Sequence, residues 1–129
     1  MSAWHSASHD DPDSAGGQQM IKMQAFLAGQ FVYMVNKLKS YSDGPYSLLD
    51  NTAVVLGTQN GSSTQSNPDH DPRNTPLVVA GSAGGAWTTG RVVDCGGRNQ
   101  NDLYLSITKA FGMATPTIGN PAWCKGPMI

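Results

Sequence analysis

Three histidines are the side chains of this sequence best suited to binding a metal ion. His5 and His9 are four positions apart, so on a helical turn both imidazoles face the same way and could grip one cation. His70 lies between Asp69 and Asp71 and could add a third ligand, oriented by a neighbouring carboxylate. Three such ligands and an open position are typical of hydrolytic metal sites. Solvated loop histidines and an Asp-rich turn would show the same residue types, so both interpretations stay open.

The remaining reactive side chains give weaker indications. Arg73 could bind an anionic group or could equally be a surface charge. Cys95 and Cys124 predict either one disulfide, closing a loop of about thirty residues, or two buried free thiols. Their spacing is not that of a zinc site. No serine stands in a nucleophile elbow such as G-x-S-x-G, and the glycine-rich run Gly81–Gly85 favours a plain turn over an anion-binding loop.

Two short strands are expected to carry these residues. Ala53–Leu56 and Leu77–Ala80 are each apolar at consecutive positions, which is typical of strands covered on both faces of an α/β sheet. We therefore predict two main parallel strands, with the site in the connecting loop at the strand ends, where ligands of open α/β sheets sit. Ala86–Val93 alternates weakly and predicts a hairpin or edge strand.

Two helices complete the expected elements. Gln18–Lys39 has apolar residues at steps of three and four, which predicts one buried stripe made of Met20, Met23, Leu27, Phe31, Met34 and Leu38. Leu103–Phe111 predicts a second helix, capped by Asn101 or Asp102, with Leu103, Ile107, Ala110 and Phe111 buried and Gly112 as its C-terminal cap. The fold class is thus α/β, with two helices beside the strands.

Length and composition limit the classes of function. The 129 residues suffice for one domain, which we divide into a polar histidine-bearing segment (1–17), an α/β core (18–119) and a tail (120–129). The formal net charge is −1 and no basic cluster is present, so nucleic acid is an unlikely partner. No apolar run reaches membrane-spanning length, and Met1–Gly17 lacks the apolar core of a signal peptide. Because two covered strands require neighbours, we expect the C-terminal part of a larger sheet.

An ordered series of motifs resembles a known family. The series is W-H-S-A-S-H, L-L-D-N-T-A-V-V-L-G-T, H-D-P-R-N-T-P-L-V-V-A-G-S-A-G-G, T-G-R and N-D-L-Y-L-S-I-T-K-A-F-G. It is similar to the C-terminal part of an uncharacterised exported bacterial family, domain of unknown function fifteen-fifty-two, over nearly all of 1–119. That family is itself similar to the alkaline phosphatase and sulfatase superfamily, which has a doubly wound sheet and a metal site at the strand ends.

The resemblance implies roles for particular residues. His5 and His9 look like the acid and histidine, four apart, that share one metal in such phosphatases. His70, ahead of Pro76 and Leu77, looks like the later histidine that completes the site. The strand end that supplies Asp-His to the other metal looks like Gln59–Asn60 here, and neutral amides bind zinc less well than a carboxylate and an imidazole.

The implied function is that of a phosphatase- or sulfatase-like hydrolase fold, present here as its C-terminal portion. The superfamily's nucleophile and first aspartate lie in an N-terminal half outside this chain, so the chain alone is expected to be inactive. The implied cofactor is a divalent ion (zinc, calcium or manganese), and the implied partner is the missing half of the fold. The parent protein is expected in the periplasm or outside the cell. The alternative is a non-catalytic exported binding or structural module with a degenerate metal site.

Overall fold

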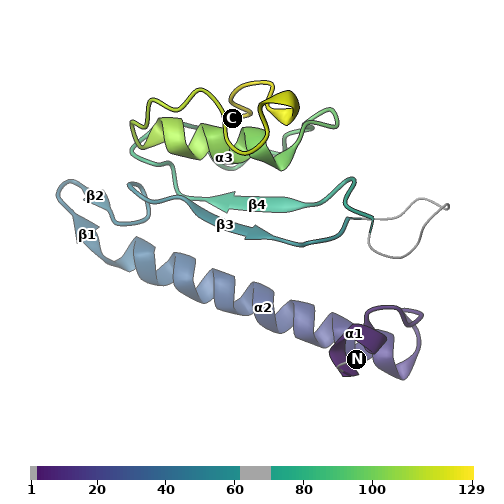
Figure 1. The fold of residues 1–129 in the computed structure, drawn as a ribbon. Helices are drawn as coiled ribbons and strands as arrows, with labels where there is room; N and C mark the ends of the chain where they lie inside the picture. Colours follow the sequence, from purple (N-terminus) through teal and green to yellow (C-terminus); the bar gives the residue numbers. More distant parts are fainter. Residues whose placement is uncertain (1–2, 62–70) are drawn as a thin grey trace.

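The computed structural model describes residues 3–61 and 71–129, and it mixes helices with strands (Figure 1). His70, and with it the predicted third ligand, lies outside the described residues. In chain order the elements are helices α1 (Ala3–Ala7) and α2 (Ala15–Ser40), strands β1 (Ser42–Asp43), β2 (Tyr46–Ser47), β3 (Val54–Gly57) and β4 (Leu77–Ala80), helix α3 (Gln100–Ala110) and the 3₁₀ turn η1 (Pro121–Trp123).

The long helix α2 is confirmed, with slightly wider bounds than predicted. Ser14 caps it by accepting a hydrogen bond from the Gly17 N–H, and Lys37 and Lys39 lie in the last turn, where cations complement the helix dipole. The predicted stripe is only partly covered: Met20, Met23, Phe31 and Leu38 are half-buried, whereas Leu27 and Met34 are each 43% exposed. None of the described helices is long and apolar enough to cross a membrane.

Strands β3 and β4 form a two-stranded sheet, but its strands are antiparallel. Val54 pairs with Ala80 and Gly57 with Leu77, so the prediction of two parallel strands is wrong. Apolar residues at consecutive positions indicate that both faces of a strand are covered. They do not indicate whether the strand pairs in parallel or antiparallel with its neighbour. Direction follows from the connection, whose ends are held together by a 2.8 Å hydrogen bond from the Gly61 N–H to the Asp71 carbonyl, as in a hairpin with a long loop.

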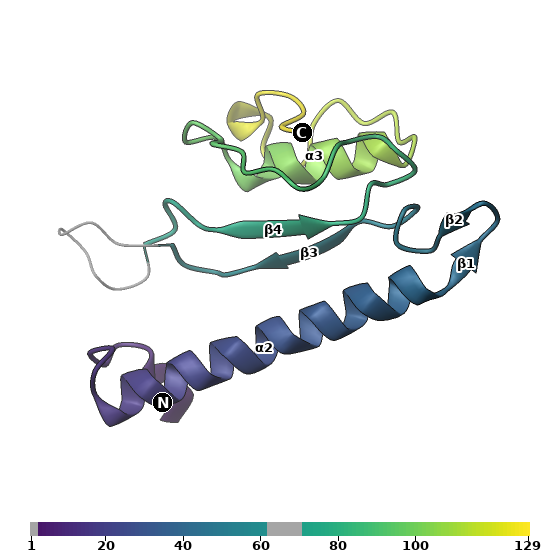
Figure 2. The same ribbon diagram turned by 180° about the vertical axis from the view of Figure 1, so that it is seen from behind.

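The sheet lies between two helical layers, with α2 on one side and α3 on the other (Figure 1), and the view from behind shows the same order (Figure 2). This arrangement agrees with strands that are apolar at consecutive positions. Coverage is uneven, because Val54 is buried while Val78 is 52% exposed. A second small sheet, the β1–β2 hairpin, turns at Gly44 and connects α2 to the segment that leads into β3.

The run Gly81–Gly85 is a turn, as predicted, and it is packed against the segment before β3. The N–H groups of Ala83 and Gly84 donate hydrogen bonds to the carbonyls of Thr52 and Asp50, so they face protein backbone. Next to it, Trp87 is buried and its indole N–H donates to the Gly81 carbonyl at 2.7 Å. The structure shows no strand over 86–93, so the predicted hairpin or edge strand there is wrong. Gly90, with a φ of 74°, interrupts the extended backbone that a strand over this range would need.

Helix α3 contributes Leu103 and Leu105 to the buried core. It begins one turn earlier than predicted, because Asn99 caps it by accepting a hydrogen bond from the Asn101 N–H, and it ends before Gly112, whose φ of 77° suits a C-terminal cap. Leu103 and Leu105 are buried, but Phe111 is 53% exposed, which corrects the predicted stripe. The buried side of the helix is shifted because it also carries polar residues that bind the C-terminal segment.

Candidate functional site

The histidine pair is formed in the structure. His5 lies on α1, and His9 follows in a turn where the N–H groups of Ser8 and His9 donate to the carbonyls of His5 and Ser6. The two Nε2 atoms are 3.3 Å apart, and the rings meet edge to face with centroids 4.9 Å apart. Two nitrogens bound to one tetrahedral zinc at about 2.1 Å would be separated by about 3.4 Å. The pair therefore already has the spacing of two ligands on one ion.

The separation of the two Nε2 atoms also allows a hydrogen bond between the rings. Because the Nε2 atoms are within hydrogen-bonding distance, one ring donates from Nε2 and the other accepts there. For both Nε2 atoms to bind one dication, the ring that donates from Nε2 would carry its hydrogen on Nδ1 instead, like its partner.

The polar end of β3 does not add an obvious ligand. The Thr58 hydroxyl donates to the main-chain carbonyl of Asn60 at 2.6 Å, and Asn60 itself is half-buried. The neighbouring Gly61 is packed tightly, since a Cβ at this position would collide with the Arg73 carbonyl. This contact and the Gly61–Asp71 hydrogen bond close the base of the connection from β3 to β4.

Arg73 pairs with a buried carboxylate. Its Nε and Nη2 atoms donate to the Asp71 carboxylate at 2.8–3.2 Å, and its backbone N–H donates to the same group at 2.9 Å. These hydrogen bonds from Arg73 hold the pKa of Asp71 below its ordinary value. The Asp71 side chain is 4% exposed and the Arg73 side chain 65% exposed. Because the Asp71 carboxylate is bound by Arg73, it is poorly placed to accept a hydrogen bond from a metal-bound histidine. The anion-binding role of Arg73 stays a prediction.

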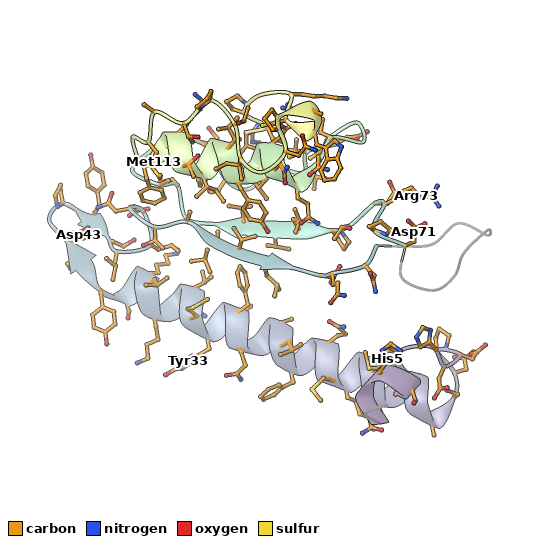
Figure 3. The ribbon with its side chains drawn as sticks, in the orientation of Figure 1. His5, Tyr33, Asp43, Asp71, Arg73 and Met113 are labelled. Atoms are coloured by element: carbon orange, nitrogen blue, oxygen red, sulfur yellow. The ribbon has the colours of Figure 1, made fainter. Side chains whose placement is uncertain are left out.

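The histidines and the loop base lie at one end of the molecule. Figure 3 places His5 near the start of α2, with Asp71 and Arg73 beyond the end of the sheet on the same side, and Asp43 and Met113 at the opposite end. The figure also shows a separation between α1 and the loop base. Within 3–61 and 71–129, no group of three or more His, Cys, Asp or Glu side chains could hold a metal ion. The described part of the candidate metal site thus consists of the Nε2 atoms of His5 and His9.

A second polar cluster was missed by the sequence analysis. The side chain of Asp102 on α3 is fully buried and accepts hydrogen bonds from Arg98 Nε at 2.9 Å and from the Lys125 N–H at 2.7 Å. Burial raises the pKa of this carboxyl, but the hydrogen bonds from Lys125, Arg98 and the Cys124 thiol lower it more, so the pKa lies below its ordinary value. Four residues further along α3, the Ser106 hydroxyl accepts from the N–H groups of Met128 and Ile129. These hydrogen bonds attach the C-terminal segment to α3. Arg98, Asp102 and Ser106 follow one another at intervals of four residues, and this spacing was the feature of the sequence that could have indicated a polar side of the helix.

Both cysteines are free thiols in the structure, so of the two alternatives the disulfide is not formed there. Cys95 contacts the Val93 carbonyl at 3.8 Å, and Cys124 donates to Asp102. Near them, a hollow of about 330 Å³ lies between β4, the loop 87–95, Leu103 and the C-terminal residues Met128 and Ile129, with a mostly apolar lining. A second hollow of about 330 Å³ lies between the histidine-bearing turn and α2. The second hollow is lined by Ala7, Ser8 and Asp10 from that segment, and neither histidine is among its lining residues.

Comparisons were made with protein-family models, with curated proteins and with solved structures. None of the three finds a match to this chain.

Proposed function

We propose that this chain is part of an exported hydrolase-like protein of the alkaline phosphatase and sulfatase type, and that its own part of the metal site is the His5–His9 pair. The observation that carries the proposal is the 3.3 Å separation of the two Nε2 atoms. Imidazole nitrogen suits zinc and related transition metals, whereas calcium prefers oxygen ligands. Of the three ions that the family resemblance implies, zinc therefore fits this pair best.

The incomplete covering of α2 supports the idea of a larger fold. Phe26, Val32 and Tyr33 are 55–61% exposed on a helix that lies over only a two-stranded sheet. Exposed apolar surface of this extent is typical of a face that another element covers. Because β3 and β4 are antiparallel, the parallel part of a doubly wound sheet would have to come from other strands. An open reading frame that continues upstream of Met1 would support this part of the proposal, and an in-frame stop codon directly upstream would refute it.

The chain by itself is expected to show no turnover. In the superfamily the nucleophile and the first aspartate belong to the N-terminal half, and the resemblance matches this chain to the C-terminal part. A histidine pair alone binds a cation and leaves it largely hydrated, with no positioned group to attack a phosphate or sulfate ester. The pair would then serve as a portion of a site that the rest of the parent protein completes.

A calorimetric titration with ZnCl₂ near pH 7 tests the metal-binding part. The wild-type chain is expected to bind zinc with a 1:1 stoichiometry, and His9→Ala is expected to bind about a hundredfold more weakly, since the second ligand no longer binds intramolecularly. His5→Ala should behave in the same way, because the two ligands are equivalent. Asp13→Ala, which alters an exposed carboxylate four residues after His9 in the sequence, is the matched control and should retain wild-type affinity.

The second candidate function is a non-catalytic exported binding or structural module. The engagement of Asp71 by Arg73 favours it, because a carboxylate held by a guanidinium is not free to bind a cation. Under this alternative, replacing His5, His9 and His70 with Ala leaves ligand binding and thermal stability almost unchanged. Loss of zinc binding in either single histidine variant would count against it.

A further inference from the structure

The histidine pair depends on a structure that is too short to be stable alone. Helix α1 has 5 residues, and isolated helices shorter than about 12 residues are marginal in water because nucleation is costly. The spacing of His5 and His9 requires this turn to be formed. Something outside α1 must therefore stabilise it, and the contacts with α2 are the described structure that does so.

Two glycines allow the segment that joins α1 to α2 to pack on the first turn of α2. Gly17 is the buried residue of α2, and a Cβ there would collide with the Asp11 carbonyl and come within 2.7 Å of Pro12 Cα. At Gly16, a Cβ would collide with the Asp10 carboxylate. The chain before α2 therefore packs directly on the backbone of Gly17, where any side chain would meet backbone atoms, whereas the obstacle at Gly16 is a flexible side chain. Neither glycine has a positive φ, so space and not backbone conformation explains why glycine is present.

Polar contacts hold the fold-back in register. The Ser14 N–H donates to the Asp11 carbonyl at 2.9 Å, the Asp13 N–H donates to the Asp11 carboxylate at 2.9 Å, and the Gln18 amide donates to the Pro12 carbonyl at 2.9 Å. The segment 11–18 is thus a compact turn between the two helices. Ala7, Ser8 and Asp10 line one hollow together with Met20, Ile21 and Gln24 of α2.

We infer that Gly16 and Gly17 are positioning residues for the His5–His9 pair as a binding site for one divalent cation. They let the preceding chain pack on the first turn of α2, and this packing stabilises the turn that holds the two imidazoles at the spacing of two ligands. The inference rests on the proposed function. If α1 is docked in only a fraction of molecules, the apparent affinity for metal falls by that fraction. The two glycines then tune zinc affinity without contacting the ion.

Three alanine variants of helix α2 test this inference in the full chain. Gly17→Ala is expected to weaken zinc binding about tenfold, because its Cβ meets backbone that cannot move aside. Gly16→Ala should weaken it less, because the obstacle is the end of one side chain. Gly29→Ala is the matched control: it lies in the same helix, a Cβ there meets nothing within 4 Å, and affinity should not change.

A double variant separates positioning from a general loss of helix. If the Asp10 carboxylate is what Gly16→Ala displaces, Asp10→Ala combined with Gly16→Ala should bind zinc as well as Asp10→Ala alone. A purely structural effect of alanine on the helix would not be rescued in this way, since alanine is a better helix former than glycine. Equal zinc affinity of Gly17→Ala and Gly29→Ala, or no rescue in the double variant, would overturn the inference.

Amide hydrogen exchange, measured without metal, tests the role of the two glycines independently of whether the histidines bind zinc. The Ser8 and His9 amides donate to the His5 and Ser6 carbonyls, so they report whether the turn is formed without any metal. Their exchange should be about tenfold faster in Gly17→Ala than in Gly29→Ala. If wild type binds no zinc but this difference is found, the proposed function fails and the docking role of the glycines stands. If exchange is equal in the two variants, the docking role fails.

Discussion

Asp102→Ala is expected to lower the thermal midpoint by about 10 °C and to release the C-terminal segment from α3. The substitution removes the acceptor of the Lys125 N–H and leaves the Arg98 guanidinium, whose side chain is 27% exposed, without its carboxylate. Circular dichroism melting measures the loss, and limited proteolysis after Lys125 measures the release. Asp94→Ala is the control, because that exposed carboxylate accepts a local hydrogen bond from the Gly96 N–H. Similar melting of both variants would contradict this role of Asp102.

Acid should remove the same contribution from the wild type. The pKa of Asp102 lies below 3.8 in the folded chain and returns to the ordinary value when the chain unfolds. A depressed native pKa stabilises the fold above the unfolded pKa, and that stabilisation disappears as pH falls through the native pKa. The difference in melting temperature between wild type and Asp102→Ala should therefore be constant from neutral pH down to about pH 5 and shrink below about pH 4.

Gly81→Ala is expected to be the other strongly destabilising change, at about 3 kcal/mol. Gly81 has a φ of 85°, and a Cβ there would collide with the Thr52 carbonyl and come within 2.7 Å of the Leu49 carbonyl. The substitution would separate the turn after β4 from the segment before β3 and would strain the carbonyl that accepts from Trp87. Urea unfolding gives the free energy of unfolding.

Gly85 provides a control with nearly the same positive φ. Its φ is 87°, but a Cβ there would meet nothing within 4 Å. Gly85→Ala should therefore cost only the left-handed backbone strain, about 1–2 kcal/mol. The difference between the two variants isolates the collision with the Thr52 carbonyl. If both variants lose the same free energy of unfolding, packing against that carbonyl does not stabilise the fold.

The elements were predictable from sequence where apolar spacing alone determines them. The period of apolar residues in α2 and the β-branched run Leu77–Ala80 gave these elements nearly at their observed bounds. Strand direction was not predictable, because residues buried on both faces look alike in parallel and antiparallel pairs. The buried side of α3 was also mispredicted. Asp102 and Ser106 are buried because they bind the C-terminal segment, and a rule that counts only apolar residues assigns them to the surface.

Only those features of the candidate site that involve residues close together in the sequence were predictable. His5 and His9 are brought together by one helical turn, so their separation of four residues was sufficient. The pairing of Asp71 with Arg73 is just as local, but the sequence does not show whether Asp71 orients His70 or binds the arginine. The packing of Gly16 and Gly17 against residues 10–12 depends on how the chain turns between α1 and α2, which no period in the sequence reveals.

Nitrogen-15 NMR of the two imidazoles, recorded while ZnCl₂ is added, tests the central claim most directly. The account predicts that the Nε2 resonances of His5 and His9 shift together and stop shifting at one equivalent of zinc, with both Nδ1 atoms protonated at the end of the titration. Shifts at only one of the two rings, or no shift at one equivalent, would contradict the claim that this pair binds a cation.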